Sequence, residues 1–242
     1  VVLPQSSLII YVRKEAKLPS FGKRKGILCH ISSLPGAYGC GSMGKESRDF
    51  IDYLAEKGYS LWQVLPLSTT GKGDSPYYSS SVFAGNELLI DAEDLFARGL
   101  VTKEELEEAK QEIKGSRIRF SVTREKRTAL YQKAYERFEK DASFEKFVKE
   151  NEDWLPDYAL FMALKENFGG AAWQEWPNGA RNRTRLGVYK KKLEKEIGYH
   201  LFVQYIFSLQ LDALRKYANE KGICLFGDLP IYVADDSADV WA

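Results

Sequence analysis

Residues 61–91, which read LWQVLPLSTTGKGDSPYYSSSVFAGNELLID, decide the fold of this protein. The segment opens with the apolar run Leu61–Leu65, whose length and composition are typical of a buried strand. Pro66 ends the strand because proline donates no ladder hydrogen bond. The loop that follows carries Tyr77 and Tyr78 and is longer and less polar than a simple connection. We interpret it as a binding loop; the alternative, a surface loop whose tyrosines cover their own core, stays open.

Two further strands are predicted on either side of this segment. Residues Ile27–Ile31 are typical of a strand, and Lys45–Lys57 has apolar side chains on one helical face. Strand, helix and strand in this order form a βαβ unit, whose two strands are parallel. A long helix over Tyr199–Lys221 leads into a third core strand, Ile223–Phe226. The pattern therefore predicts an α/β fold.

Residues 92–198 are charged and follow a helical period. Thr102 and Glu105 form a capping box for a helix that ends near Gly115. A further helix is predicted over Thr123–Lys140, a short amphipathic turn over Ser143–Glu150, and another helix over Trp154–Phe168. The last of them is apolar around most of its circumference, so we expect it to be buried on several sides. We interpret the segment as an inserted helical subdomain between two parts of one body, residues 25–91 and 199–242.

Three glycines, Gly39, Gly41 and Gly44, spell the G-x-G-x-x-G pattern of dinucleotide-binding proteins. The first of them lies well past the end of the predicted strand, whereas the first glycine of the fingerprint directly follows its strand. The chain also reads Gln63 and Val64 where an acidic residue should hold the ribose. The glycines are therefore interpreted as structural, and no cofactor is predicted.

The composition argues against several classes of partner. Lys and Arg number 35 against 34 Asp and Glu, so no strong net field attracts nucleic acid or an anionic membrane. The basic run at residues 181–192 is followed by Glu194 and Glu196, and we interpret it as a solvated face. No apolar run reaches the roughly 18 residues of a membrane span.

Cysteine is scarce, with Cys29, Cys40 and Cys224 only. An odd count argues against a disulfide framework and for a reducing compartment. Only two histidines accompany them, His30 and His200, so no cluster has zinc-like spacing and no metal site is predicted. No signal peptide is recognisable, and the expected location is cytoplasmic.

Five blocks of sequence carry a resemblance to a known family. They are GILCHISSLPGAYGCGSMG, LWQVLPL, GDSPYYSSSVFAGN, WLPDYALFMALKENFGG and GICLFGDLPIYVADDSADVWA. In this order they resemble the opening part of the amylomaltases, the 4-α-glucanotransferases of glycoside hydrolase family 77. The resemblance implies a TIM-barrel enzyme that cuts an α-1,4-glucan, such as a maltooligosaccharide or a starch or glycogen fragment. It passes the released piece to another sugar by a retaining double displacement.

The expected barrel is incomplete. A (β/α)8 barrel needs eight strands in about 250 residues, whereas three core strands are predicted here. The family's nucleophilic Asp, acid/base Glu and third carboxylate would all lie after Ala242, so no catalytic residue is expected in this chain. At the other end, residues 1–24 are interpreted as a tail and linker. Residues 3–12 resemble the last strand of the β-sandwich that closes many α-amylases, which would imply an upstream module.

The resemblance implies a sugar-binding wall in this chain. Tyr77 would be a stacking platform beside the scissile sugar, on a loop that Asp74 and Ser75 shape. Asp228 would be a hydrogen-bonding carboxylate at the same subsite. Its place after the third strand supports this role, because carboxylates there face an active-site mouth; the alternative is a cap of the following turn. Three later carboxylates are interpreted as caps of the next helix: Asp235, Asp236 and Asp239.

The sequence departs from the family's pattern at three positions. Tyr78 stands where Gln is common and Glu87 where Pro is common, and both border the expected sugar site, so they put acceptor preference in doubt. Leu211 stands where Trp is frequent and is expected to affect packing only. Two alternative functions remain at this point: a related barrel glucan hydrolase, and a glucan-binding module without catalysis.

Overall fold

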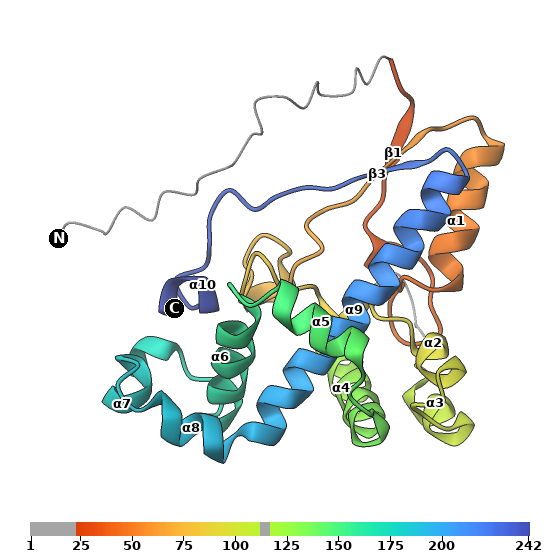
Figure 1. Ribbon diagram of the computed structural model, residues 1–242. Helices are drawn as coiled ribbons and strands as arrows, with labels where there is room; N and C mark the ends of the chain where they lie inside the picture. The colour runs from red at the N-terminus through yellow and green to blue at the C-terminus, as the bar shows by residue number, and fades with distance from the viewer. Residues whose placement is uncertain (1–22, 112–116) are drawn as a thin grey trace.

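A small parallel sheet lies at one end of the molecule. The computed structural model describes residues 23–111 and 117–242 (Figure 1). Strands β1 (Gly26–Leu28), β2 (Leu61–Gln63) and β3 (Cys224–Phe226) pair in the order β1-β2-β3, with Ile27 opposite Trp62 and Trp62 opposite Leu225. Trp62 is fully buried, and its indole Nε1 donates to the Cys29 carbonyl at 2.7 Å. The predicted parallel α/β arrangement is confirmed.

Each strand is shorter than predicted. The pairing extends one residue past the strands, because Cys29 N donates to Gln63 O and Val64 N donates to Phe226 O. Beyond that point the chain turns away, and a 3₁₀ turn occupies Ile31–Ser33. The apolar runs therefore continue into buried loop residues, which periodicity alone cannot distinguish from strand residues.

Two helices cover the sheet. Helix α1 (Lys45–Glu56) connects β1 to β2, and its Phe50 packs edge-on against Trp62 with ring centroids 5.0 Å apart. Helix α9 (Glu194–Glu220) leads into β3 and also contacts α1. Buried Ile51 and Leu54 of α1 and Leu214 of α9 belong to the same core. The predicted helix–strand order is confirmed.

The segment between β2 and β3 is mainly helical. The helices that precede α9 in it are α2 (Ala92–Ala97), α3 (Lys103–Ala109), α4 (Phe120–Arg137), α5 (Ala142–Glu150), α6 (Leu155–Asn167), α7 (Asn178–Arg181) and α8 (Leu186–Lys192). Short 3₁₀ turns lie at Lys72–Asp74, Glu87–Leu89 and Trp173–Glu175, and α10 is Ala238–Trp241. In Figure 1, α4 to α8 gather at the end of the molecule away from the sheet.

Several helix boundaries differ from the predictions. The capping box of Thr102 and Glu105 is present, but α3 ends at Ala109 rather than near Gly115, and residues 112–116 lie outside the described part. Helix α4 spans Phe120–Arg137, shifted by three residues from the prediction. Helix α9 starts at Glu194 rather than at the predicted Tyr199. The periodicity missed this first turn because it is charged, whereas Glu194 and Glu196 favour a helix N-terminus.

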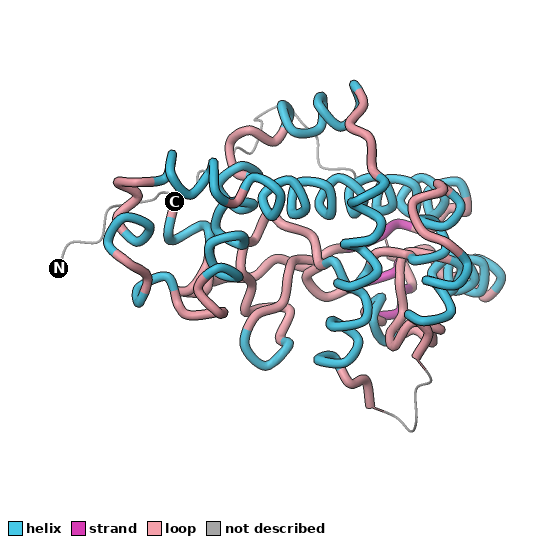
Figure 2. Tube along the Cα trace, turned by 90° about the horizontal axis from the view of Figure 1, so that it is seen from below, coloured by secondary structure: helices cyan, strands magenta, loops and turns pink. Residues whose placement is uncertain are grey.

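Helix α9 joins the two ends of the molecule. It is 27 residues long and crosses the centre in Figure 2, with the strands beside one of its ends. It contacts α1 and β3 near the sheet and α4, α5, α6 and α8 elsewhere. Helix α6 is buried around most of its surface, between α9 and α10, as predicted. The division into residues 25–91, 92–198 and 199–242 stays a prediction, as does the strand at residues 3–12, which lies outside the described residues.

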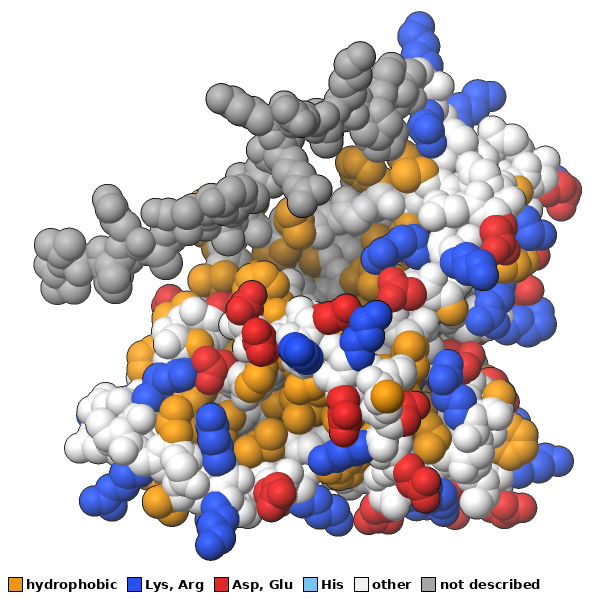
Figure 3. Space-filling model, viewed as in Figure 1, with side chains coloured by type: hydrophobic (Ala, Val, Ile, Leu, Met, Phe, Trp, Pro, Cys, Tyr) orange, Lys and Arg blue, Asp and Glu red, His pale blue; other side chains and the backbone are white. Residues whose placement is uncertain are grey.

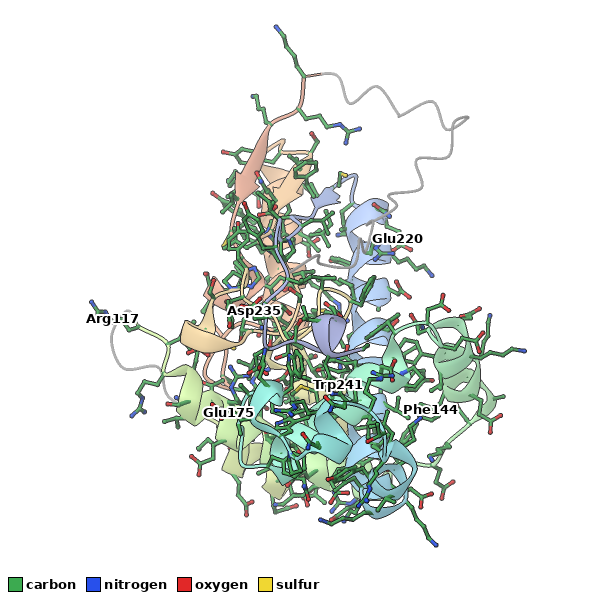
Figure 4. The ribbon with its side chains drawn as sticks, turned by 90° about the vertical axis from the view of Figure 1, so that its left-hand side faces the viewer. Arg117, Phe144, Glu175, Glu220, Asp235 and Trp241 are labelled. Carbon is green, nitrogen blue, oxygen red and sulfur yellow. The ribbon has the colours of Figure 1, made fainter. Side chains whose placement is uncertain are left out.

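An aromatic cluster attaches α10 to the helical end. Trp241, which is labelled in Figure 4, lies 5.9 Å from Trp176 and 5.8 Å from Phe161 between ring centroids. The Arg183 guanidinium lies over the Trp241 ring and donates to both carboxylate oxygens of Asp157. Arg183 is thus a packing residue, which corrects the interpretation of the whole basic run as solvated.

Both signs of charge are mixed on the face that Figure 3 shows, where Lys and Arg side chains alternate with Asp and Glu. No helix among the described residues is long and apolar enough to cross a bilayer. The three cysteines are free.

The glycines of the G-x-G-x-x-G pattern are structural. A Cβ atom on Gly41 would lie 2.2 Å from the Ile31 carbonyl oxygen, and one on Gly44 would lie 2.5 Å from the Asp91 carboxyl carbon. Gly39 adopts a φ of 91°, which side-chain-bearing residues avoid. Close packing and backbone conformation therefore account for all three.

Candidate functional site

Two loops meet beyond the carboxyl ends of β2 and β3. Tyr77 lies on the loop after β2 and Asp228 lies two residues after β3, 151 positions further along the chain. The Tyr77 hydroxyl donates to Asp228 Oδ2 at 2.6 Å. This hydrogen bond raises the pKa of Tyr77 above its ordinary value, with desolvation contributing next. Tyr77 therefore stays a neutral donor at physiological pH, with its ring about half exposed.

The two oxygens of Asp228 have different partners. Oδ1 accepts from the Leu229 backbone N at 2.8 Å, while Oδ2 accepts from Tyr77. The carboxylate thus makes a local turn contact and a long-range contact at once. Its predicted roles as a turn residue and as a site residue are compatible in this geometry.

The other two predicted site residues, Asp74 and Ser75, shape the loop. The backbone takes positive φ values of 74° at Gly73 and 53° at Asp74. Asp74 Oδ1 accepts from the Arg124 guanidinium of α4 at 2.9 Å, and Ser75 Oγ accepts from the Tyr77 backbone N at 3.3 Å. Of the four predicted residues, only Tyr77 and Asp228 contact each other through their side chains.

The base of the loop is attached to α10. Asp239 accepts from Ser81 Oγ at 2.7 Å and from the Val82 backbone N at 2.8 Å, and Ala238 N donates to the Ser80 carbonyl. The interpretation of Asp235, Asp236 and Asp239 as helix caps is therefore wrong. Ser237 caps α10 instead, because its Oγ accepts from Val240 N.

The remaining two carboxylates of that group serve other contacts. Asp236 accepts from Lys165 and from the Trp173 backbone N, so it ties the C-terminal segment to α6. Asp235 contributes its backbone carbonyl to Trp173 Nε1 at 2.7 Å, and its side chain is exposed. A run of three acids near a helix start suggested caps, but long-range partners decided their roles.

A cavity of about 240 Å³ opens beside Asp228. The loop after β2 supplies one wall through Leu67 and Phe83, and α9 supplies Phe207 and Leu211. Leu211 was expected to affect packing only, and the structure places it on this cavity wall as well. The cavity lining therefore combines mainly apolar residues with one carboxylate, Asp228, an arrangement that suits a ligand with apolar faces and hydroxyl groups.

A family model described as 4-alpha-glucanotransferase matches residues 29–242. This chain belongs to the 4-alpha-glucanotransferase family. It is 42% identical over 226 residues to the 4-alpha-glucanotransferase of Streptococcus pneumoniae TIGR4. This match covers 91% of this chain and 45% of that protein. It is 44% identical over 220 residues to the Aquifex aeolicus 4-alpha-glucanotransferase, with 89% and 44% covered. The chain thus spans less than half the length of these relatives.

Solved structures agree with the family assignment. The amylomaltase of Streptococcus agalactiae, solved in complex with acarbose, matches with a TM-score of 0.85 at 41% identity. The match covers 91% of this chain and 46% of that one. The amylomaltase of Corynebacterium glutamicum matches in fold, with a TM-score of 0.69 at 17% identity. The resemblance inferred from the five sequence blocks is confirmed.

Sequence reasoning missed Arg124 at this family member's candidate site. Arg124 lies on α4, and its guanidinium donates to Thr70 Oγ1, Asp74 Oδ1 and Glu87 Oε1. Glu87, noted as a departure from the family pattern, is therefore the partner of an arginine. Tyr78, the other departure beside the site, is exposed, and its carbonyl accepts from Gly71 N. No signal in the sequence separates Arg124 from the other basic residues of α4.

A second missed residue, His30, follows β1 at the same edge of the sheet. Its Nδ1 is buried and has no hydrogen-bond partner among the described residues. Burial lowers its pKa to about 4. The sequence placed His30 inside the predicted strand Ile27–Ile31, so no signal indicated that it lies beyond the end of β1. As for metals, no group of three or more His, Cys, Asp or Glu residues in the described ranges could hold an ion.

His30 should make stability depend on pH. Above pH 6.5 the imidazole is neutral whether the chain is folded or not, so it has no effect. As the pH falls from 6.5 to about 4, His30 becomes protonated in the unfolded chain but stays neutral in the folded protein, so the unfolded state is favoured. We expect this residue alone to remove about 2 kcal/mol of unfolding free energy between pH 7 and pH 5. Urea unfolding at both pH values measures the loss, and His30→Gln should reduce it; an equal loss in the variant would contradict the prediction.

Proposed function

We propose that this chain is the N-terminal part of a 4-α-glucanotransferase, and that it forms the first strands of an incomplete (β/α)8 barrel. The enzyme would transfer a segment of an α-1,4-glucan to glucose or to another glucan. The observation that carries the proposal is the hydrogen bond between Tyr77 and Asp228 at the carboxyl edge of the parallel sheet. In barrel enzymes this edge is where substrates bind.

The proposed role of this chain is to hold the sugar. The Tyr77 ring offers an aromatic face on which the C–H face of a glucose unit would stack, and the bond to Asp228 fixes the orientation of that ring. Asp228 would accept hydrogen bonds from sugar hydroxyls, and such charge-assisted bonds are the stronger kind. Asp74 and Ser75 would act indirectly, by shaping the loop that presents Tyr77.

The bond-breaking groups would lie outside this chain. Retaining enzymes of this class use two carboxyl groups about 5 Å apart, one as nucleophile and one as acid/base. A transferase then admits a sugar hydroxyl where a hydrolase admits water. In this scheme the wall formed by Tyr77, Asp228 and the mainly apolar cavity lining would orient the donor sugar and favour a sugar acceptor over water.

Exposed apolar side chains support the incomplete barrel. Leu28 and Phe226 are about half exposed on the strands, and Leu229, Ile231 and Tyr232 after β3 are about four-fifths exposed. Apolar groups gathered in this way mark surfaces that another element covers. Further barrel strands, as the greater length of the relatives permits, would cover them. The three free cysteines are typical of a reducing compartment and support a cytoplasmic location.

A product analysis with maltotriose tests the proposal. The complete enzyme that contains this chain should release glucose and, at the same time, form maltooligosaccharides longer than maltotriose. The 242-residue chain alone should form neither product, because the reacting carboxylates would lie outside it.

Each other outcome identifies a different function. Glucose and maltose without longer products would indicate a hydrolase. Maltotriose binding without any product from the complete protein would indicate a binding module. Glucose release by the 242-residue chain itself would contradict the assignment of the catalytic groups to residues outside it.

A further inference from the structure

Arg124 connects three points of the loop that carries Tyr77. Its Nη2 donates to Thr70 Oγ1 at 3.2 Å and to Asp74 Oδ1 at 2.9 Å, and its Nη1 donates to Glu87 Oε1 at 3.0 Å. Thr70 lies near the start of the loop, Asp74 lies three residues before Tyr77, and Glu87 lies beyond the end of the loop. A single side chain of α4 therefore spans the loop from its first turn to its last.

The backbone beside this contact needs an external restraint. Asp74 has a φ of 53°, in the left-handed region that residues other than glycine occupy at a cost in energy. A conformation of this kind persists only where surrounding contacts hold it. Within the loop, Gly71 N donates to Tyr78 O and Asp74 N donates to Gly71 O at 3.3 Å, whereas the Asp74 side chain is held by Arg124 alone among the described residues.

A continuous path of bonds leads from Arg124 to the carboxylate beyond β3. Arg124 holds Asp74, the adjacent Ser75 accepts from Tyr77 N, and Tyr77 donates to Asp228. Loss of the first bond would release the Asp74 backbone and, with it, the position of the Tyr77 ring. We propose that Arg124 is a positioning residue for Tyr77, so that the helical segment sets the geometry of the sugar-binding wall; this inference rests on the proposed function.

The exposure of the partners separates this role from a stabilising one. The Arg124 side chain is 33% exposed, and those of Asp74 and Glu87 are 38% and 23% exposed. Ion pairs this accessible to water contribute little to global stability. Substrate binding is more sensitive, because a displacement of about 1 Å in a positioned group can reduce a rate by up to about a hundredfold. The effect of losing Arg124 should therefore appear in kinetics before it appears in stability.

Arg137 provides a matched control on the same helix. Its Nη1 and Nη2 donate to the two carboxylate oxygens of Glu105, each at 2.8 Å, and its side chain is 40% exposed. It links α4 to α3, away from the loop. Arg124→Ala and Arg137→Ala thus remove the same side chain from one helix. The first loses the ion pairs to Asp74 and Glu87, and the second loses the bidentate pair to Glu105. Only the first releases the Tyr77 loop.

The test uses the complete enzyme and maltotriose disproportionation. Arg124→Ala should raise KM about tenfold or more while kcat falls by less, with a Tm close to that of Arg137→Ala. Arg137→Ala should keep wild-type kinetics. Arg124→Lys should recover part of the loss, because a lysine can hold one of the two carboxylates. A fall in Tm with KM and kcat unchanged would show a purely structural role and overturn the inference.

A double-mutant cycle shows whether Arg124 acts through Tyr77. In a Tyr77→Ala background, Arg124→Ala should have almost no further effect on KM, because the ring it positions is gone. If Arg124→Ala raised KM by the same factor with and without Tyr77, the inference would be overturned while the proposed function stayed intact. A wild-type enzyme that neither converts nor binds maltotriose in calorimetric titration would overturn the proposed function, and this inference with it.

Discussion

Replacing Asp228 by Asn should lower kcat/KM for maltotriose disproportionation by about ten- to a hundredfold in the complete enzyme. The substitution keeps the shape of the side chain and removes its charge, so bonds to sugar hydroxyls lose their charge-assisted character. Such bonds contribute about 1.5–3 kcal/mol each, which corresponds to that range of rates. Loss of a reacting carboxylate would cost far more, so the size of the effect distinguishes a binding carboxylate from a catalytic one.

Asp235→Asn is the matched control. Asp235 lies on the same segment after β3 and is labelled in Figure 4. Its side chain is exposed and makes no hydrogen bond to the described residues. Its variant should keep wild-type kinetics, and Tm should be unchanged for both variants. Unchanged kinetics in Asp228→Asn would mean that this carboxylate only holds the Leu229 turn.

Two variants of Tyr77 separate the contributions of its hydroxyl and its ring. Tyr77→Phe keeps the ring and removes the donor to Asp228, whereas Tyr77→Ala removes both. If the ring stacks on the sugar, the Ala variant should raise KM more than the Phe variant. Equal effects would assign the whole contribution to the hydroxyl and its bond to Asp228.

Gln204→Leu should lower the free energy of unfolding by about 2–6 kcal/mol. Two buried backbone groups would lose the only side-chain partner that they have among the described residues, and each loss costs about 1–3 kcal/mol. Gln204 lies on α9 and is 2% exposed. Its Oε1 accepts from Gly85 N at 2.7 Å, and its Nε2 donates to Gly85 O at 2.9 Å. This pair of bonds attaches the end of the site loop to the long helix.

Thermal unfolding measures the effect, which corresponds to a fall in Tm on the order of 10 °C for a protein of this size. Gln132→Leu on α4 makes the same chemical change at an exposed position and should leave Tm nearly unchanged. A similar Tm for both variants would show that the Gly85 backbone finds other partners. Gln210, which makes the same kind of paired bonds to Asp91, is a second position for the test.

Local patterns predicted the elements of the fold better than their ends. The βαβ unit followed from a short apolar run, an amphipathic helix and a second run, and these periods depend only on neighbouring residues. The α3 capping box was predicted correctly for the same reason. The ends of β1 and α9 were wrong because buried loop residues continue an apolar run, and a charged first turn hides the start of a helix.

The candidate site was predicted only in part. The sequence pointed to Tyr77 through the length and composition of its loop, and to Asp228 through its place after a strand. Asp239 shows the limit of such reasoning, because it looked like a cap and instead holds Ser81 and Val82 of the loop. Its partners lie 157 and 158 positions away in the chain, beyond the range of any local pattern.

The amino-acid sequence by itself determined the parallel α/β elements, the family and the loop that carries Tyr77. Each of these depends on residue types at short spacing along the chain, and such patterns are present in the amino-acid order before the chain folds. Only the tertiary structure decided that Tyr77 contacts Asp228, that Arg124 holds Asp74, and that Gln204 holds Gly85. The first contact joins the loops after β2 and β3, and the other two join α4 and α9 to the loop, so packing between distant segments, rather than local propensity, assembles the candidate site.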